Sequence, residues 1–276
     1  MTQCTELLWK RRWMRTDYCK FVGTMRPIDK KKAGETVLVH HASGATRSET
    51  ILQTYNCYRD AKPHLTAHLG EFCSYCENNI DEMNLAVEHI EPKELSKKTG
   101  KAYYEHDWDN YLLACTMCNS QKSTRHYLPS DLHLPQNNNT FLSFVYLPGG
   151  IVQVNPNLTG QSKQHAKNLM DLTKIGNWGR NCSPKDKRWQ YRSRAWQVAT
   201  DCLNEYKEGK ITTNRVIESA KAQGFWSIWF TIFKGEDEVL KRLISDFEGT
   251  SASCFDANNH YQPVPRPSNA GKSDPI

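Results

Sequence analysis

The chain has 276 residues, of which 36 are basic and 30 acidic, so that its formal net charge is +6. A chain of this length can bury a sizeable core, as one large domain or two small ones. The modest positive charge permits nucleic acid as a partner without requiring it. No apolar run approaches a membrane span, and the basic beginning lacks the apolar core of a signal peptide, so we expect neither a membrane anchor nor secretion.

Residues 1–24 are rich in Trp, Arg and Lys without a steady period, and form a basic N-terminal extension. A new segment opens at Met25, which could itself be the natural start of the protein. Over residues 25–70 we expect helix between Thr46 and Leu69, with a break or restart near Pro63. Gly70 is a typical helix-stop residue.

The segment 71–130 reads as strand, loop, strand and helix, held by two cysteine pairs. The alternating pattern of NLAVEHI, residues 84–90, predicts a short strand. A polar loop over roughly 91–109 follows, and NYLLAC, residues 110–115, predicts a second strand. NSQKSTRH, residues 119–126, is expected to begin a helix directly after the second pair.

The remainder of the chain turns from strand to helix. Within 131–160, two strands around Pro148, Gly149 and Gly150 predict a β-hairpin. The region 161–250 is predicted to be helical, with helices near 162–174, 184–207, 213–223 and 237–247. The apolar stretch Phe225–Phe233 is expected in the core, although an exposed patch of that size would mark a partner interface. The tail 251–276 is rich in Asn and Pro and predicts loose or wrapped coil, which completes an α+β protein.

Two cysteine pairs predict a structural zinc site. The chain has ten cysteines, and four of them form two C-x2-C pairs: Cys73 with Cys76, and Cys115 with Cys118. Such pairs can direct four thiolates tetrahedrally at one ion, and two of them about 40 residues apart are a strong zinc signal. The alternative is a pair of disulfides. The scattering of the other cysteines favours a reducing cytoplasm with one metal site.

The segment between the pairs holds residues that a structural zinc site does not need. Glu88 and His89 are adjacent at the end of the first strand, and Asn119 directly follows the last cysteine. A carboxylate and an amide oxygen suit Mg²⁺ or another hard divalent ion, and His89 could take a proton from water. Each has a plainer interpretation, since His89 could be a core histidine and Asn119 a helix N-cap.

This ordered set resembles the HNH endonuclease motif, the ββα-metal nuclease fold, in its zinc-clasped form. The resemblance implies that His89 is the general base and Glu88 a ligand of the catalytic Mg²⁺ or Mn²⁺. Asn110 would orient the loop, Asn119 would be the other metal ligand, and Lys122 would lie near phosphate. Glu at 88 and Asn at 119 replace the more common Asp and His of that family.

Beyond residues 73–125 the likeness is looser. The MRPI start, FWSIWFTIF and CFDANNHYQPVPRP are similar to PtuB-like nucleases of Septu and retron anti-phage systems. That resemblance implies an ATPase partner of the ABC or SMC type.

Several further polar residues invite a role. A further metal ligand could come from His106, Asp107 or Asp109, but their positions are more typical of loop residues. We expect His126 and His133 at the surface.

On the helix near 184–207, Arg188 and Arg192 share a face with Trp196 and Ala199. Such an arginine needs a partner, either an acid in the nuclease module or, as we hypothesise for Arg192, a phosphate in the cleft.

The sequence therefore predicts a metal-dependent endonuclease that acts on nucleic acid, with DNA favoured over RNA. RNA, including tRNA, remains the alternative substrate. A different class is also open, namely a zinc-based binding module with a silent site.

Overall fold

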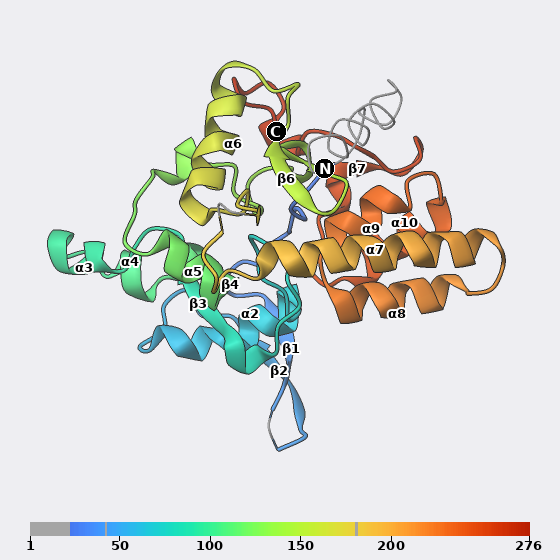
Figure 1. Ribbon diagram of the computed structural model, residues 1–276. Helices are drawn as coiled ribbons and strands as arrows, with labels where there is room; N and C mark the ends of the chain where they lie inside the picture. Colours follow the sequence, from blue (N-terminus) through green and yellow to red (C-terminus); the bar gives the residue numbers. More distant parts are fainter. Residues whose placement is uncertain (1–22, 42, 180–181) are drawn as a thin grey trace.

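The computed structural model describes residues 23–41, 43–179 and 182–276 (Figure 1). The predicted basic extension, residues 1–24, lies outside these ranges except for its last two residues. Within them the fold is α+β, as expected, with four separate two-stranded antiparallel sheets and a helical C-terminal region. No helix in the described ranges has the length and apolar character needed to cross a membrane.

The N-terminal segment begins with a hairpin where we expected helix. Strand β1 (Thr36–His40) pairs with β2 (Thr46–Thr50), with Thr36 opposite Thr50. The alternation of buried and exposed residues along β1 explains the sheet, because it buries Val37 and Val39 on one face. The predicted helix is therefore wrong at its beginning.

Helix is present only further along this segment. The 3₁₀ turn η2 (Tyr58–Ala61) leads into α2 (Lys62–Leu69), which has Pro63 in its first turn. The helix ends at Gly70, as predicted.

The two predicted strands of the central module are present and pair with each other. Strand β3 (Leu85–His89) runs antiparallel to β4 (Tyr111–Cys115). Four short helical segments stand before and between them, η3 (Glu82–Asn84), α3 (Glu94–Thr99), α4 (Tyr103–His106) and η4 (Trp108–Asn110).

The helix after the second cysteine pair, α5 (Thr116–Lys122), begins three residues earlier than predicted. Cys115 is its N-cap and accepts a hydrogen bond from the amide of Cys118. The alternative in which Asn119 caps this helix is therefore wrong.

The C-terminal half follows the predicted pattern closely. The hairpin pairs β5 (Phe144–Leu147) with β6 (Ile151–Val154), between the 3₁₀ turns η5 (Pro129–Asp131) and η6 (Thr140–Leu142) and the helices. The helices are α6 (Gly160–Thr173), α7 (Arg188–Lys207), α8 (Thr213–Gln223), α9 (Trp226–Ile232) and α10 (Asp237–Asp246). The apolar stretch around α9 is buried, so it belongs to the core and not to an exposed interface.

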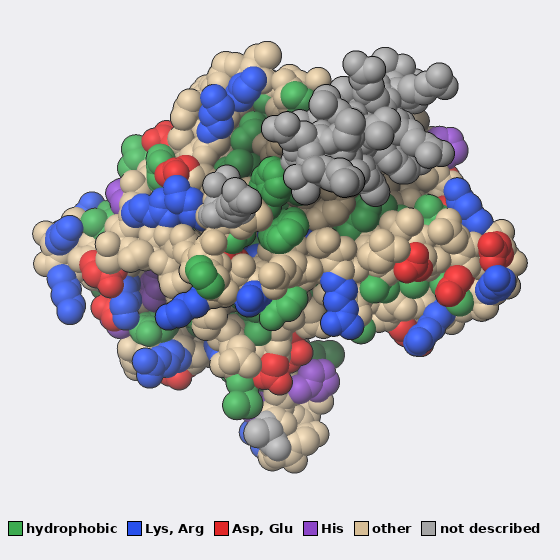
Figure 2. All heavy atoms as spheres, in the orientation of Figure 1, with side chains coloured by type: hydrophobic (Ala, Val, Ile, Leu, Met, Phe, Trp, Pro, Cys, Tyr) green, Lys and Arg blue, Asp and Glu red, His purple; other side chains and the backbone are tan. Residues whose placement is uncertain are grey.

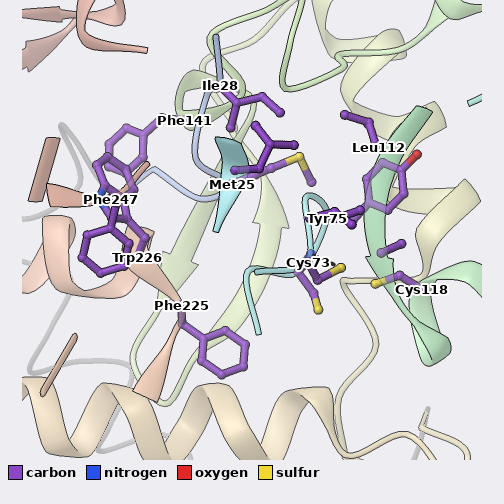
Figure 3. Close-up of a cluster of buried hydrophobic side chains, with 14 of the residues drawn as sticks. Met25, Ile28, Cys73, Tyr75, Leu112, Cys118, Phe141, Phe225, Trp226 and Phe247 are labelled. Carbon is purple, nitrogen blue, oxygen red and sulfur yellow. Dashed lines mark hydrogen bonds between the residues drawn. The ribbon is translucent and has the colours of Figure 1, made fainter. Parts of the chain in front are cut away.

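One hydrophobic core joins the C-terminal helices to the central module (Figure 3). It runs from the aromatic group of Phe141, Trp226 and Phe247 to Tyr75 and the cysteines. The side chains of Cys73 and Cys118 turn toward each other at the edge of this core. The cysteine pairs therefore lie inside the folded body, not on a separate lobe.

Close backbone contacts bind the first cysteine pair to the C-terminal helices. The carbonyl of Glu77 accepts a hydrogen bond of 2.8 Å from the amide of Phe225. At Gly224 the φ angle is +71°, and an added Cβ would lie 2.5 Å from the amide nitrogen of Asn79. Only glycine fits both this conformation and this approach.

The C-terminal tail is wrapped against the body, which settles the choice that the sequence left open. It comprises η8 (Ala252–Cys254), β7 (Phe255–Asp256), β8 (Gln262–Pro263) and η9 (Pro267–Asn269). The carbonyl of Ile276 accepts hydrogen bonds from the side chains of Asn138 and Asn269.

Candidate metal centre and active site

The four predicted cysteines converge on one point. Their Sγ atoms all lie within 4.8 Å of one another, and all four residues are buried. Sγ of Cys76 lies 3.7 Å from Sγ of Cys115, close to the edge of about 3.8 Å that a tetrahedron with Zn–S bonds of about 2.3 Å requires. The arrangement therefore fits a zinc ion held by four thiolates.

A residue of the helical region contacts this cysteine cluster. Arg188 donates from Nη1 to Sγ of Cys118 over 3.1 Å. Its other nitrogens form a two-point pair with Asp186, at 2.9 and 2.7 Å. Burial opposes the charge on Arg188, but the hydrogen bonds that it donates to Asp186 and the charge of the nearby thiolates raise its net pKa. The guanidinium offsets the charge that four thiolates around one Zn²⁺ would leave.

Glu88 is an internal carboxylate. Its side chain is 1% exposed, with Oε1 3.1 Å from Nζ of Lys122 and accepting a hydrogen bond from the hydroxyl of Tyr75. Burial raises the pKa of Glu88 to about 7, against the lowering effect of the ammonium of Lys122. The carboxylate is thus poised between its charged and neutral forms near neutral pH.

His89 lies on the opposite face of β3, because neighbouring strand residues alternate. The rings of Tyr58 and Tyr111 meet it edge-on, with centroids 4.9 and 5.2 Å away. Nε2 lies 3.2 Å from the carbonyl oxygen of Glu105. A carbonyl can only accept, so Nε2 carries the proton and Nδ1 of the neutral ring keeps a free lone pair.

The surroundings of His89 determine the charge of its ring. Burial lowers its pKa to about 4, and the nearby positive charges of Lys93 and Lys122 act in the same direction. The ring is therefore neutral at physiological pH.

Asn110 fixes the loop that lies beside His89. The side chain is fully buried; its oxygen accepts from the amide of Glu91, and its nitrogen donates to the carbonyls of Glu91 and Tyr104. Both ends of the loop between β3 and β4 are thereby held at one residue.

Asn119 lies at the middle of α5, one turn before Lys122. Residues three apart on a helix share a face. The face that carries Lys122 is turned toward Glu88, so Asn119 is placed on the same side of α5 as this carboxylate. Its side chain is half-buried.

Three sequence-based expectations require correction. Arg192 is 1% exposed and donates to the carbonyls of Gly150 and Ile175, so it binds the hairpin and the segment after α6, pairs with no acid among the described residues, and is too buried to reach a phosphate in a cleft. Lys122 is buried against Glu88 and also donates to the carbonyl of His89, which withdraws it from a phosphate at the surface. His133, expected at the surface, is completely buried.

The remaining candidates have local roles. His106 contacts the carbonyl of Tyr55, and Asp107 caps η4 by accepting from the amide of Asp109. His126 lies 3.3 Å from Glu91.

Sequence reasoning missed the cationic neighbours of His89. Nζ of Lys93 lies 4.8 Å from the centroid of the Tyr58 ring, and exposed Arg59 also contacts this ring. Lys93 stands four residues after His89 and could have been noticed, whereas Tyr58 lies outside the motif. Lysines also gather on α3, at the left of Figure 2, including exposed Lys97 and Lys98.

Comparison with known proteins agrees with this geometry. Residues 73–125 match the family model described as HNH endonuclease, which covers β3, β4, α5 and both cysteine pairs. No curated protein matches the chain. The described protein thus carries an HNH endonuclease domain over residues 73–125, built around four cysteines that are positioned to bind one metal ion.

Proposed function

We propose that the protein is a metal-dependent endonuclease that hydrolyses phosphodiester bonds, with DNA as the favoured substrate. The observation that carries this proposal is the charge and tautomer of His89. Its ring is neutral, Nε2 donates to the carbonyl of Glu105, and the lone pair of Nδ1 can accept a proton. His89 stands one residue from a buried carboxylate within an HNH endonuclease domain.

Across β3 from the ring of His89, two residues supply an oxygen donor set for a hard divalent ion. Glu88 offers a carboxylate and Asn119, on the same side of α5, offers an amide oxygen, which suits Mg²⁺ or Mn²⁺. When bound, such an ion would stabilise negative charge on the scissile phosphate and its leaving oxygen. It would also compete with the ammonium of Lys122 for Glu88.

The role of His89 follows from its tautomer. Nδ1 accepts a proton from a water molecule, and the ring becomes an imidazolium that the carbonyl of Glu105 stabilises through Nε2–H. The rings of Tyr58 and Tyr111 fix its orientation. Asn110 holds the adjoining loop, and Lys93 and Arg59 provide positive charge for a phosphate backbone.

A second candidate is a zinc-based binding module with a silent site. One observation favours it, because Lys122 already neutralises the buried carboxylate of Glu88, as a structural ion pair would. This module would bind nucleic acid or a protein partner without cutting, and its binding would not change when His89 is replaced by alanine.

The looser resemblance to PtuB-like nucleases supports a further proposal on biological role. The protein would be the cytoplasmic effector of an anti-phage system, working with an ATPase of the ABC or SMC type. Control by such a partner would explain a nuclease that is silent on its own, since unregulated cutting harms the host.

The deciding experiment is cleavage of plasmid DNA and of total cellular RNA by the purified protein with Mg²⁺ or Mn²⁺. EDTA and the variant His89→Ala are the negative controls, and His40→Ala, at an exposed histidine of β1, is the matched control that should keep activity. Cutting of DNA that both negative controls abolish supports the proposal, and cutting of RNA alone changes the substrate. Binding without cutting, also after addition of a candidate ATPase partner of the ABC or SMC type, supports the silent module.

A further inference from the structure

Three ligand-type side chains meet outside the HNH endonuclease domain. His133 follows η5, His165 lies on α6, and Asp274 lies in the C-terminal tail, which Figure 1 shows beside α6. Oδ2 of Asp274 is 2.7 Å from Nε2 of His133 and 2.7 Å from Nδ1 of His165. The three atoms all lie within 4.8 Å of one another. Residues far apart in sequence therefore direct two nitrogens and an oxygen at one point.

The surrounding hydroxyl groups fix the orientation of this cluster. The hydroxyl of Ser143 lies 2.8 Å from Nδ1 of His133, and that of Ser162 donates to Oδ1 of Asp274 over 2.6 Å. These hydroxyl groups hold the atoms that face away from the meeting point. Within the described part of the chain, the atoms that face it contact one another. Outer contacts of this kind orient the ligands of protein metal sites.

The cluster lacks a permanent positive charge. His133 is fully buried and His165 is 7% exposed. In the described ranges, the ion-pair partners of Asp274 are these two imidazoles, with no lysine or arginine among them. The side chain of Asp274 is 11% exposed, and a carboxylate that is mostly removed from water is stabilised by a nearby cation, here either a proton on an imidazole or a metal ion at the meeting point.

We propose that His133, His165 and Asp274 form a second metal site, which binds a divalent transition metal and most naturally Zn²⁺. Two imidazoles and one carboxylate are a known zinc donor set with three protein ligands, and leave a fourth position for water. Zinc with bonds of about 2.0–2.1 Å would hold its ligands about 3.3 Å apart. The present separations of 2.7 Å need only a small outward shift of side chains that stand on separate segments.

This site would fasten the C-terminal tail to the body. It joins the tail to α6 and to the segment that follows the HNH endonuclease domain, next to the hydrogen bonds on the carbonyl of Ile276. The proposal does not depend on nuclease activity, since none of its ligands belongs to residues 73–125.

Metal stoichiometry tests the proposal on the full chain. After incubation with excess Zn²⁺ and gel filtration, the protein is expected to hold at least two zinc ions, one of which a thiol-reactive mercurial releases from the cysteines. The variants Asp274→Asn and His165→Gln should each lose one mercurial-resistant ion and retain the thiolate-bound ion. The matched control, His40→Gln, alters an exposed histidine and should lose none.

Two results would overturn the site. One is wild-type protein whose zinc is released completely by the mercurial, which would leave only a hydrogen-bonded cluster. The other is a resistant ion that persists in both variants, which would place it elsewhere, for example at Glu88. Complete release from the wild type excludes the site without any variant, and if one variant fails to fold, the other still shows whether the resistant ion depends on this cluster.

Discussion

Arg188 donates a hydrogen bond to Sγ of Cys118, so the first turn of α7 contacts a ligand of the predicted zinc site. The same guanidinium pairs with Asp186 and donates to the carbonyl of Thr173. One buried side chain therefore ties the helical region to the cysteine cluster. Zinc retention and packing of the helices should depend on each other.

Replacement of Arg188 by lysine should loosen the metal. Lysine keeps the charge but cannot reach Cys118, Asp186 and the carbonyls at once. We expect zinc transfer to a chelator to become about tenfold faster, the lower end of what changes beside metal ligands cause. Arg194→Lys, at an exposed position of the same helix, is the matched control. Equal transfer rates in the two variants would show that the contact does not stabilise the site.

The buried pair of Glu88 and Lys122 should reveal itself in a double-mutant cycle. Lys122→Met leaves a carboxylate without its cation and should lower the free energy of unfolding by about 3–5 kcal/mol at pH 8. The double variant with Glu88→Gln should lose less, because no charge remains buried. Lys167→Met, at the surface of α6, should change stability by at most about 0.5 kcal/mol. Simple additivity of the two changes would exclude a coupled pair.

Secondary structure was predictable from the sequence where its pattern was strong. The strands around Glu88 and Leu113 alternate or are continuously apolar, and the helices α6, α7, α8 and α10 have clear periods, so their existence could be predicted. The stretch that forms α9 is apolar throughout, so it was expected in the core but not as a helix. The hairpin at Thr36 was missed because a polar strand such as β2 gives no periodic signal. Helix α5 began earlier than predicted because the sulfur of Cys115 replaces an ordinary cap.

The motif placed the HNH residues in order but not their charge partners. The spacing of residues along the chain cannot show that Lys122 points inward to Glu88, or that Arg192 donates hydrogen bonds to two carbonyls. These are long-range contacts set by packing. The same holds for His133, whose partners lie on α6 and in the tail, so that no local pattern could bring them together.

Lys93 is the expected substitute for the predicted phosphate contacts. It stands over Tyr58, whose ring touches His89, so it lies close to the proposed catalytic base. Lys93→Gln should weaken binding of DNA alike for all sequences and reduce the slope of log K against log salt by about one. The control Lys241→Gln removes an exposed charge on α10. If both variants reduce the slope equally, the effect is one of net charge and Lys93 has no special position.

The acid side of the activity profile should depend on the concentration of Mn²⁺. The pKa of Glu88 is raised to about 7 by burial, so in the metal-free protein this carboxylate gains a proton as the pH falls through 7. The pKa of His89 is lowered to about 4, so this base stays neutral until much lower pH. Loss of activity near pH 7 would then report Glu88, and loss near pH 4 would report His89.

Protons and Mn²⁺ compete for the carboxylate of Glu88. Changing the Mn²⁺ concentration therefore distinguishes a loss of activity caused by Glu88 from one caused by His89. With subsaturating Mn²⁺, each tenfold increase in its concentration should move the acid midpoint down by about one pH unit, until protonation of His89 sets the limit. Glu91→Gln removes a nearby acid that pairs with His126 instead, and should leave this shift intact. A midpoint that stays fixed across Mn²⁺ concentrations would show that Glu88 does not bind the catalytic ion, whatever the role of His89.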